Sequence, residues 1–133
     1  MRIRRLAAAF LVAAAALPAV ALPAAAGAPP MAAYAVVRDA TDEDGYIVEG
    51  KDVFNSAIGR VGATKTEPGS VEVRFSTWPT GNVNVLVTPL SAKPRACAVG
   101  TWSLEPTYLS VHINCNDRHG FSVDTPFIVS VRS

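Results

Sequence analysis

The chain has 133 residues, of which 50% are hydrophobic and 17% charged, and its formal net charge at pH 7 is +1. Much of the apolar content lies in the first 26 residues. The remaining residues, 27–133, have the length of a single domain. Three of the twelve basic side chains also lie in the first 26 residues, which leaves nine against eleven acidic side chains, about −2. Nucleic-acid binding needs clustered Lys and Arg, so this balance excludes it as an expected function.

The first 26 residues have the order of a secretory signal peptide. Residues 1–5 carry three arginines, residues 6–22 form an almost uncharged Ala/Leu/Val run, and Ala24-Ala25-Ala26 provides a small-residue cleavage site. A retained membrane anchor is the alternative, which the prolines and weakly apolar composition of the run disfavour. We therefore expect a secreted, extracellular protein without membrane attachment after cleavage, with a disordered stretch over 27–32 and one domain over 33–133.

The two cysteines, Cys97 and Cys115, predict a disulfide, because an even number of cysteines in an exported chain normally pairs. A catalytic thiol or a metal site is the alternative, but the cysteines and histidines lack zinc spacing. An antiparallel hairpin turning near residues 105–107 would place Cys97 opposite Cys115. Their buried face would then include the neighbours of the same parity, Val99, Thr101, Leu109, Val111 and Ile113. Cysteines on facing sheets remain the alternative arrangement.

Alternation of apolar and polar residues with a period of two dominates the rest of the chain. It is clearest over residues 71–75 and 83–87, and the turn residues Pro79, Gly81 and Asn82 predict that these two strands form a hairpin. Further strands are predicted at 33–38, 46–49, 51–55, 63–66 and 127–132, the last with Phe127, Val129 and Val131 inward. Seven to eight short antiparallel strands predict an all-β fold, a β-sandwich or flattened barrel.

Several motifs occur in a fixed order from Tyr34 onward. They are Phe54-Asn55-Ser56, Gly81-Asn82-Val83, Cys97 followed by Trp102, Val111-His112-Ile113-Asn114-Cys115 and Phe127-Ile128-Val129-Ser130. In these motifs the chain resembles an uncharacterised repeat domain, roughly 100 residues long, of exported bacterial proteins. The resemblance implies a single copy of a domain with one cysteine pair, and it implies no activity.

Candidate catalytic and metal-binding residues have more ordinary interpretations. The acidic cluster of Asp39, Asp42, Glu43 and Asp44 suggests a calcium loop, but Lys51 stands where the bidentate acid is required. We therefore expect a solvated turn and no metal or cofactor. His112 is expected on a solvent-facing strand position, His119 in a turn, and Asp124 in the organisation of another turn. Without a recognisable nucleophile motif, these residues do not predict an enzyme.

Aromatic side chains provide the ligand-binding hypothesis. Trp78 is predicted at a hairpin tip, and Trp102 and Tyr108 flank the turn of the disulfide hairpin. Exposed aromatic rings can stack on sugars or anchor a protein partner. For Trp102 the alternative is packing over the disulfide. Leu86 interrupts the polar face of its strand and suggests a covered surface or a contact patch.

These observations together predict a secreted, non-catalytic extracellular binding or structural module. The expected partner is an extracellular protein or a polysaccharide, and the expected state is a monomer. The alternative function is a secreted inhibitor of an extracellular hydrolase that presents the segment Lys93-Pro94-Arg95 beside the disulfide.

Overall fold

The computed structural model describes residues 31–78 and 81–133. The predicted signal peptide and residues 27–30 lie outside these ranges, as do Pro79 and Thr80 of the predicted hairpin turn. The backbone N–H of Met31 donates to Ser133 Oγ at 3.0 Å, and the first strand begins at Ala32. The predicted disordered stretch is therefore wrong for residues 31 and 32. Within the described residues, no helix is long and apolar enough to cross a membrane.

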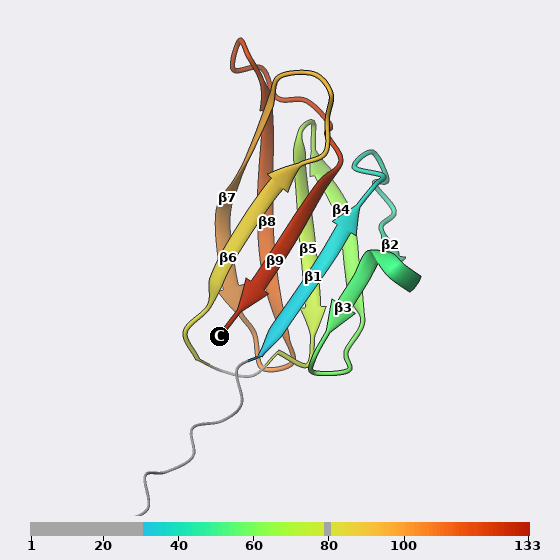
Figure 1. Ribbon diagram of the computed structural model, residues 1–133, viewed down its shortest axis with the longest axis vertical. Helices are drawn as coiled ribbons and strands as arrows, with labels where there is room; N and C mark the ends of the chain where they lie inside the picture. The colour runs from blue at the N-terminus through green and yellow to red at the C-terminus, as the bar shows by residue number, and fades with distance from the viewer. Residues whose placement is uncertain (1–30, 79–80) are drawn as a thin grey trace, which may run out of the picture.

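The described residues form nine strands in two antiparallel sheets, which pack face to face as a β-sandwich (Figure 1). The four-stranded sheet has the order β3 (Val53–Asn55), β1 (Ala32–Val37), β9 (Phe127–Arg132), β6 (Asn84–Pro89). The five-stranded sheet has the order β2 (Tyr46–Val48), β4 (Val61–Glu67), β5 (Ser70–Ser76), β8 (Tyr108–Asp117), β7 (Arg95–Leu104). One short 3-10 helix, η1 (Gly50–Asp52), precedes β3 within the stretch predicted as a strand. The all-β sandwich is thus confirmed, with more strands than predicted.

The core lies between the sheets and consists of alternate residues from the central strands. Phe127, Val129 and Val131 of β9 are fully buried, as predicted. They belong to the same core as Phe75 and Leu109, which lie on the inner face of the five-stranded sheet. Each fully buried Val, Leu or Phe contributes about 1.5–3 kcal/mol through removal of apolar surface from water. The period-two pattern therefore determines which face of each strand is covered.

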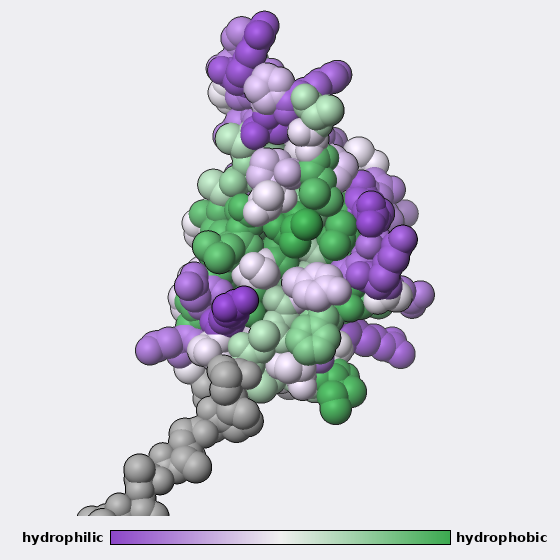
Figure 2. All heavy atoms as spheres, in the orientation of Figure 1, coloured by the Kyte–Doolittle hydropathy of each residue, from purple (hydrophilic) through white to green (hydrophobic). Residues whose placement is uncertain are grey.

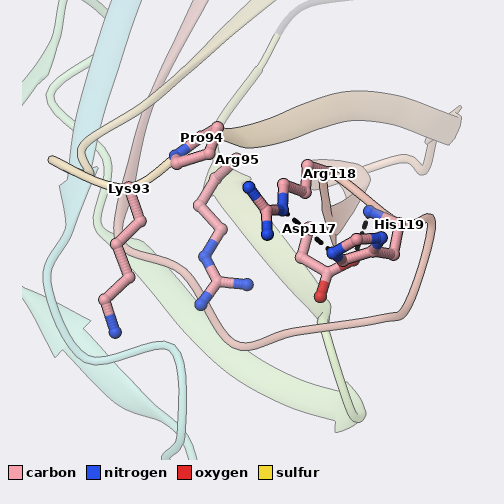
Figure 3. A pocket seen from close by; sticks show the side chains of 6 residues that line it. All are labelled: Lys93, Pro94, Arg95, Asp117, Arg118 and His119. Atoms are coloured by element: carbon pink, nitrogen blue, oxygen red, sulfur yellow. Dashed lines mark hydrogen bonds between the residues drawn. The ribbon is translucent and has the colours of Figure 1, made fainter.

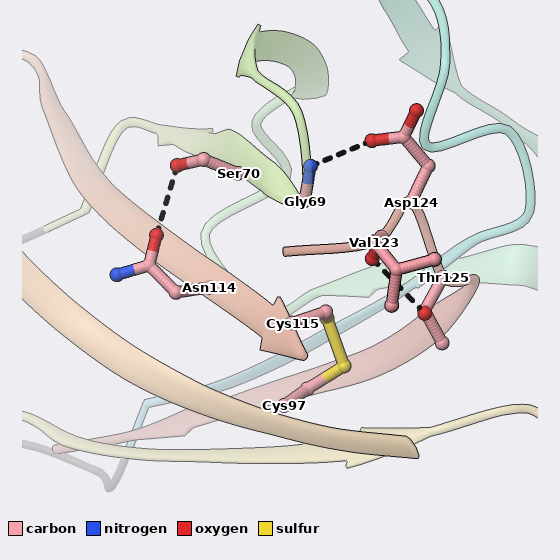
Figure 4. Close-up of a disulfide and its surroundings, with 8 residues drawn as sticks. All are labelled: Gly69, Ser70, Cys97, Asn114, Cys115, Val123, Asp124 and Thr125. Carbon is pink, nitrogen blue, oxygen red and sulfur yellow. Dashed lines mark hydrogen bonds between the residues drawn. A yellow bond between two sulfur atoms is a disulfide. The ribbon is translucent and has the colours of Figure 1, made fainter. Parts of the chain in front are cut away.

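Cys97 and Cys115 form the disulfide, and they are direct register partners of β7 and β8, with Cα atoms 4.1 Å apart (Figure 4). Glu105 N–H donates to Tyr108 O at 2.9 Å and closes the hairpin where the sequence predicted its turn. Both the pairing and the hairpin register at the cysteines are confirmed. The bond lies on the inner side of the sheet, because Cys115 is buried and Cys97 packs against the core.

A β-bulge at Gly100 changes the face of the residues that follow it in β7. The register shifts between Val99 and Thr101, so that Trp102 pairs with Val111 and Leu104 with Leu109. A bulge inserts one extra residue, and every later side chain then points to the opposite face. Thr101 is exposed, and the prediction that it shares the buried face is wrong for this reason. A Cβ at position 100 would collide with the side-chain amide of Asn114.

The predicted hairpin between residues 71–75 and 83–87 is also wrong. β5 pairs with β4 and β8, whereas β6 pairs with β9 in the other sheet, so the connection crosses from one sheet to the other. The tight hairpin lies instead between β4 and β5, at Pro68-Gly69. Gly69 has φ of 73°, and a Cβ at this position would lie 2.6 Å from Val123 N and 2.7 Å from Cys115 O, so only glycine fits this turn.

Replacing both cysteines in C97A/C115A should lower the free energy of unfolding by about 3 kcal/mol, because the bond removes conformational freedom from the unfolded chain. Urea unfolding with and without reductant measures this loss. Reductant should destabilise the wild-type protein and leave the double variant unchanged. Equal urea midpoints for oxidised wild type and double variant would contradict a stabilising role of the bond.

Candidate functional site

Trp78 lies in the core and not at an exposed hairpin tip. Its side chain is 3% exposed and meets the ring of Phe75 edge to face, with ring centroids 6.3 Å apart. Among the described residues, its indole Nε1–H has no hydrogen-bond partner. The residue follows β5 where the chain crosses to the other sheet, and its burial anchors that crossing. A buried indole offers no surface to a ligand, so the prediction of an exposed Trp78 is corrected.

Trp102 and Tyr108 flank the hairpin turn as predicted, but they lie on opposite faces of the five-stranded sheet. Trp102 shares the inner face of Val111 on the edge strand β7 and remains 45% exposed. Tyr108 lies on the outer face, where the guanidinium of Arg74 sits 5.4 Å from its ring centroid. Trp102 follows Cys97 by five strand residues, roughly 16 Å, so it does not pack over the disulfide.

The outer face of the five-stranded sheet carries a polar network centred on Glu72. Arg74 contacts this carboxylate with Nε and Nη2, each at 2.9 Å, and Ser110 Oγ donates to it. His112 Nε2 lies 3.8 Å away. Burial alone would raise the pKa of Glu72, but hydrogen bonds from Arg74 and Ser110 and the charges of Arg74 and His112 hold it below its ordinary value.

This network stabilises an ionised carboxylate and does not activate a nucleophile. Ser110 donates its proton toward Glu72, and Glu72 is also held by Arg74. A hydrolytic triad requires the hydroxyl to face an imidazole that a carboxylate orients. Here the carboxylate stands between Ser110 and His112, so the imidazole does not receive the hydroxyl proton.

Asp124 joins two distant segments beside the disulfide (Figure 4). Its Oδ1 accepts the backbone N–H of Gly69 at 2.7 Å, and its Oδ2 accepts from Lys65 Nζ at 2.9 Å. Burial alone would raise the pKa of Asp124, yet the Gly69 N–H and the Lys65 ammonium hold it below its ordinary value. The sequence predicted a turn-forming role, whereas the side chain clamps the β4–β5 hairpin to the segment before β9.

The outer face of the four-stranded sheet is apolar, in contrast to the polar outer face of the other sheet. Figure 2 shows hydrophobic side chains gathered over the middle of this sheet, with hydrophilic ones at the upper end and along one side. We call this surface the outer apolar face and define it by Tyr34, Val36, Phe54, Leu86 and Ile128, which occupy outward strand positions.

One row of register partners runs across the outer apolar face. Leu86 pairs with Ser130, Ser130 with Tyr34, and Tyr34 with Phe54, so the four side chains lie side by side on four strands. Leu86 is 63% and Phe54 49% exposed. The rings of Tyr34 and Phe54 have centroids 6.1 Å apart and planes inclined by only 23°. The row is therefore uncharged, partly aromatic and open to solvent.

The sequence interpretation identified Leu86 but missed Tyr34 and Phe54. The signal that could have found Tyr34 is the composition of β1, AAYAVV, which has no charged residue and alternates at neither parity, whereas Phe54 lies in the short strand β3, VFN. A strand covered on one face normally alternates, and a continuous apolar run indicates that both faces meet apolar surroundings. In β1 the inward positions hold Ala33, Ala35 and Val37, two of them small, and the larger Tyr34 and Val36 point outward.

Comparison with known proteins found no matching family model and no significant match among curated proteins or solved structures. The resemblance to an exported bacterial repeat domain therefore stays a prediction from the sequence. Function has to be inferred from the surfaces described above.

Trp78→Ala should lower the free energy of unfolding by about 3–5 kcal/mol, since it leaves a cavity in the core. Trp78→Phe should cost clearly less, because it keeps a ring and removes an indole N–H that has no partner among the described residues. Urea unfolding of both variants makes the comparison. A Trp78→Ala variant as stable as wild type would contradict the buried position.

Asp124→Asn should lower stability at pH 7 by about 1–3 kcal/mol, since it removes a charged hydrogen-bond partner. A carboxylate with a lowered pKa stabilises the fold above its unfolded pKa, and this contribution is lost as pH falls through its folded pKa. The difference in the free energy of unfolding between variant and wild type should therefore shrink as pH falls from about 5 to about 2, the range in which Asp side chains titrate. Urea unfolding at several pH values tests this, with the exposed Asp44→Asn as control. A difference independent of pH would refute the clamp.

Proposed function

We propose that this protein is an exported, non-catalytic module that binds a neutral polysaccharide through the outer apolar face. The carrying observation is the contrast between the two outer faces: one holds a satisfied polar network, the other an exposed uncharged row with an aromatic pair. Monomeric proteins rarely leave a contiguous apolar patch exposed unless it contacts something.

The geometry of the aromatic pair favours sugar as the ligand class. Tyr34 and Phe54 project from neighbouring strands of a sheet, with nearly parallel rings. The apolar C–H face of a sugar ring stacks on such a surface, and rings fixed by a sheet lose little rotamer freedom on binding. Ser130, in the same row, provides a hydroxyl beside Tyr34 for hydrogen bonding to sugar hydroxyls.

Export is part of the proposal and is supported by two independent features. Residues 1–26 have the order of a signal peptide. The Cys97–Cys115 disulfide is typical of oxidising, extracytoplasmic compartments. The non-catalytic part is supported by the Glu72 network, where Ser110 is directed to a carboxylate and away from the imidazole of His112.

The test is binding to insoluble cellulose and chitin, with Phe54→Ser as the variant. Its control is Ile47→Ser, because Ile47 is similarly exposed (46% against 49%) but lies on the outer face of the five-stranded sheet. Phe54→Ser should weaken binding about tenfold or more, as expected on loss of an aromatic anchor. Ile47→Ser should bind as wild type does.

Three outcomes would overturn the proposal. The first is that neither polysaccharide retains the wild-type protein, and the second is that both variants bind equally. The third is that sedimentation velocity shows a wild-type dimer and a Phe54→Ser monomer, which would make the face a contact between two copies of the chain.

A further inference from the structure

A cationic hollow lies at the end of the sandwich opposite the first residues of β1. Its volume is about 230 Å³, and we define it by the residues that line it, Lys93, Pro94, Arg95, Asp117, Arg118 and His119 (Figure 3). The residues come from the link between β6 and β7 with the first residue of β7, and from the last residue of β8 with the turn that follows it. Lys93 and Arg95 are close in the sequence, and only the fold brings Arg118 to them.

The backbone around the hollow is held by the disulfide hairpin. Arg95 and Asp117 are register partners, two residues from the bonded pair Cys97–Cys115. Asp117 Oδ1 accepts the backbone N–H groups of His119 at 2.8 Å and Phe121 at 3.1 Å, which closes the turn. A site on such a framework requires little ordering when a ligand binds.

The one carboxylate that lines the hollow is engaged in this turn. The pKa of Asp117 lies below its ordinary value, chiefly because the carboxylate accepts the backbone N–H of His119. Burial acts in the opposite direction, whereas the N–H of Phe121 and the charges of His119 and Arg95 lower the pKa further. Asp117 is therefore ionised at neutral pH and committed to backbone donors. Arg118 Nε donates to His119 Nε2 at 2.9 Å, which orients the guanidinium and leaves its terminal N–H groups for other acceptors.

The cations of the hollow differ in their pairing from three other cations on the described surface. Arg38, Lys65 and Arg74 each have a carboxylate oxygen within 2.9 Å. Within the described residues, Lys93, Arg95 and Arg118 form no ion pair at 4.0 Å or less. Residues 27–133 carry nine basic and eleven acidic side chains. Three cations around one engaged acid create a local positive field against this background, and such a field attracts anions.

We propose that the cationic hollow binds the acidic groups of an anionic polysaccharide, whose carboxylates or sulfates pair with Arg95 and Arg118. Guanidinium groups bind both oxyanions in a bidentate manner. The hollow is smaller than the roughly 300–1,000 Å³ of pockets for drug-sized ligands, so it accommodates one charged sugar unit. Neighbouring units would meet exposed Lys93 and, in the same turn as His119, Phe121, which is 71% exposed and available for stacking on a sugar.

The experiment measures affinity for polygalacturonate, heparin and neutral dextran by affinity electrophoresis at about 20 and 200 mM salt, where screening lengths differ about threefold. The variant R95Q/R118Q removes two charges from the hollow. The control R60Q/R132Q removes the same charge from arginines that also form no ion pair within the described residues. Phe54→Ser is included because it removes the proposed neutral-sugar surface and leaves the hollow intact.

Wild type, R60Q/R132Q and Phe54→Ser should bind the acidic polymers at low salt more tightly than dextran, which carries no charged group for the hollow to bind. R95Q/R118Q should bind at least about tenfold more weakly, as expected for loss of two charged hydrogen-bond partners. Polygalacturonate and heparin distinguish carboxylate from sulfate as the preferred group, and either preference supports the proposal.

Equal weakening by R60Q/R132Q would mean diffuse charge attraction and would overturn the site. So would the absence of wild-type binding to both acidic polymers, or tighter binding to duplex DNA, measured in the same way as a further polymer, than to either. Because Phe54→Ser reports on the outer apolar face alone, failure of this proposal and failure of the proposed function give different results.

Discussion

The rest of the structure depends on one constraint: each sheet of the sandwich buries only one of its two faces. The inner faces supply the core, and residues such as Val129 and Val73 have no role beyond filling it. The outer faces are free to differ. One carries the Glu72 network and the other the row from Leu86 to Phe54. Because burial of the inner faces supplies the packing energy, the outer rows can serve binding with little effect on the fold.

Sequence reasoning succeeded where the determining interactions are local. The parity of Phe127, Val129 and Val131 follows from alternation within one strand, and the hairpin that aligns Cys97 with Cys115 turns over three residues. It failed where partners are distant in the chain. The pattern of residues 71–87 predicts two half-buried strands correctly, but nothing in it specifies that β6 pairs with β9 on the other side of the core.

The candidate surfaces were harder to predict for the same reason. Trp102 changes face because of a single bulge at Gly100, an effect that alternation alone does not reveal. Tyr34 and Phe54 meet only because β1 and β3 pair, and Arg95 and Arg118 line one hollow only because the start of β7 lies beside the turn after β8. The position of an aromatic residue near a predicted turn is therefore a poor indicator of a binding site, since Trp78 is buried where the chain crosses between the sheets.

The two surfaces proposed as binding sites suit a polymer that contains both neutral and acidic sugar units. The outer apolar face is uncharged, and the cationic hollow is concave and basic, at one end of the molecule. Two weak sites on one rigid domain can hold a long chain more firmly than either alone, provided that the chain spans both. The disulfide and the Asp124 clamp keep the loops at this end in place.

The most direct measurement of the central claim is an NMR titration of the labelled protein with a soluble chitin or cellulose oligosaccharide. The account predicts that amide and side-chain shifts concentrate on Tyr34, Phe54, Leu86 and Ser130, while Glu72, Ser110 and His112 on the opposite outer face stay unchanged. Shifts confined to the Glu72 face, or none at saturating oligosaccharide, would contradict it.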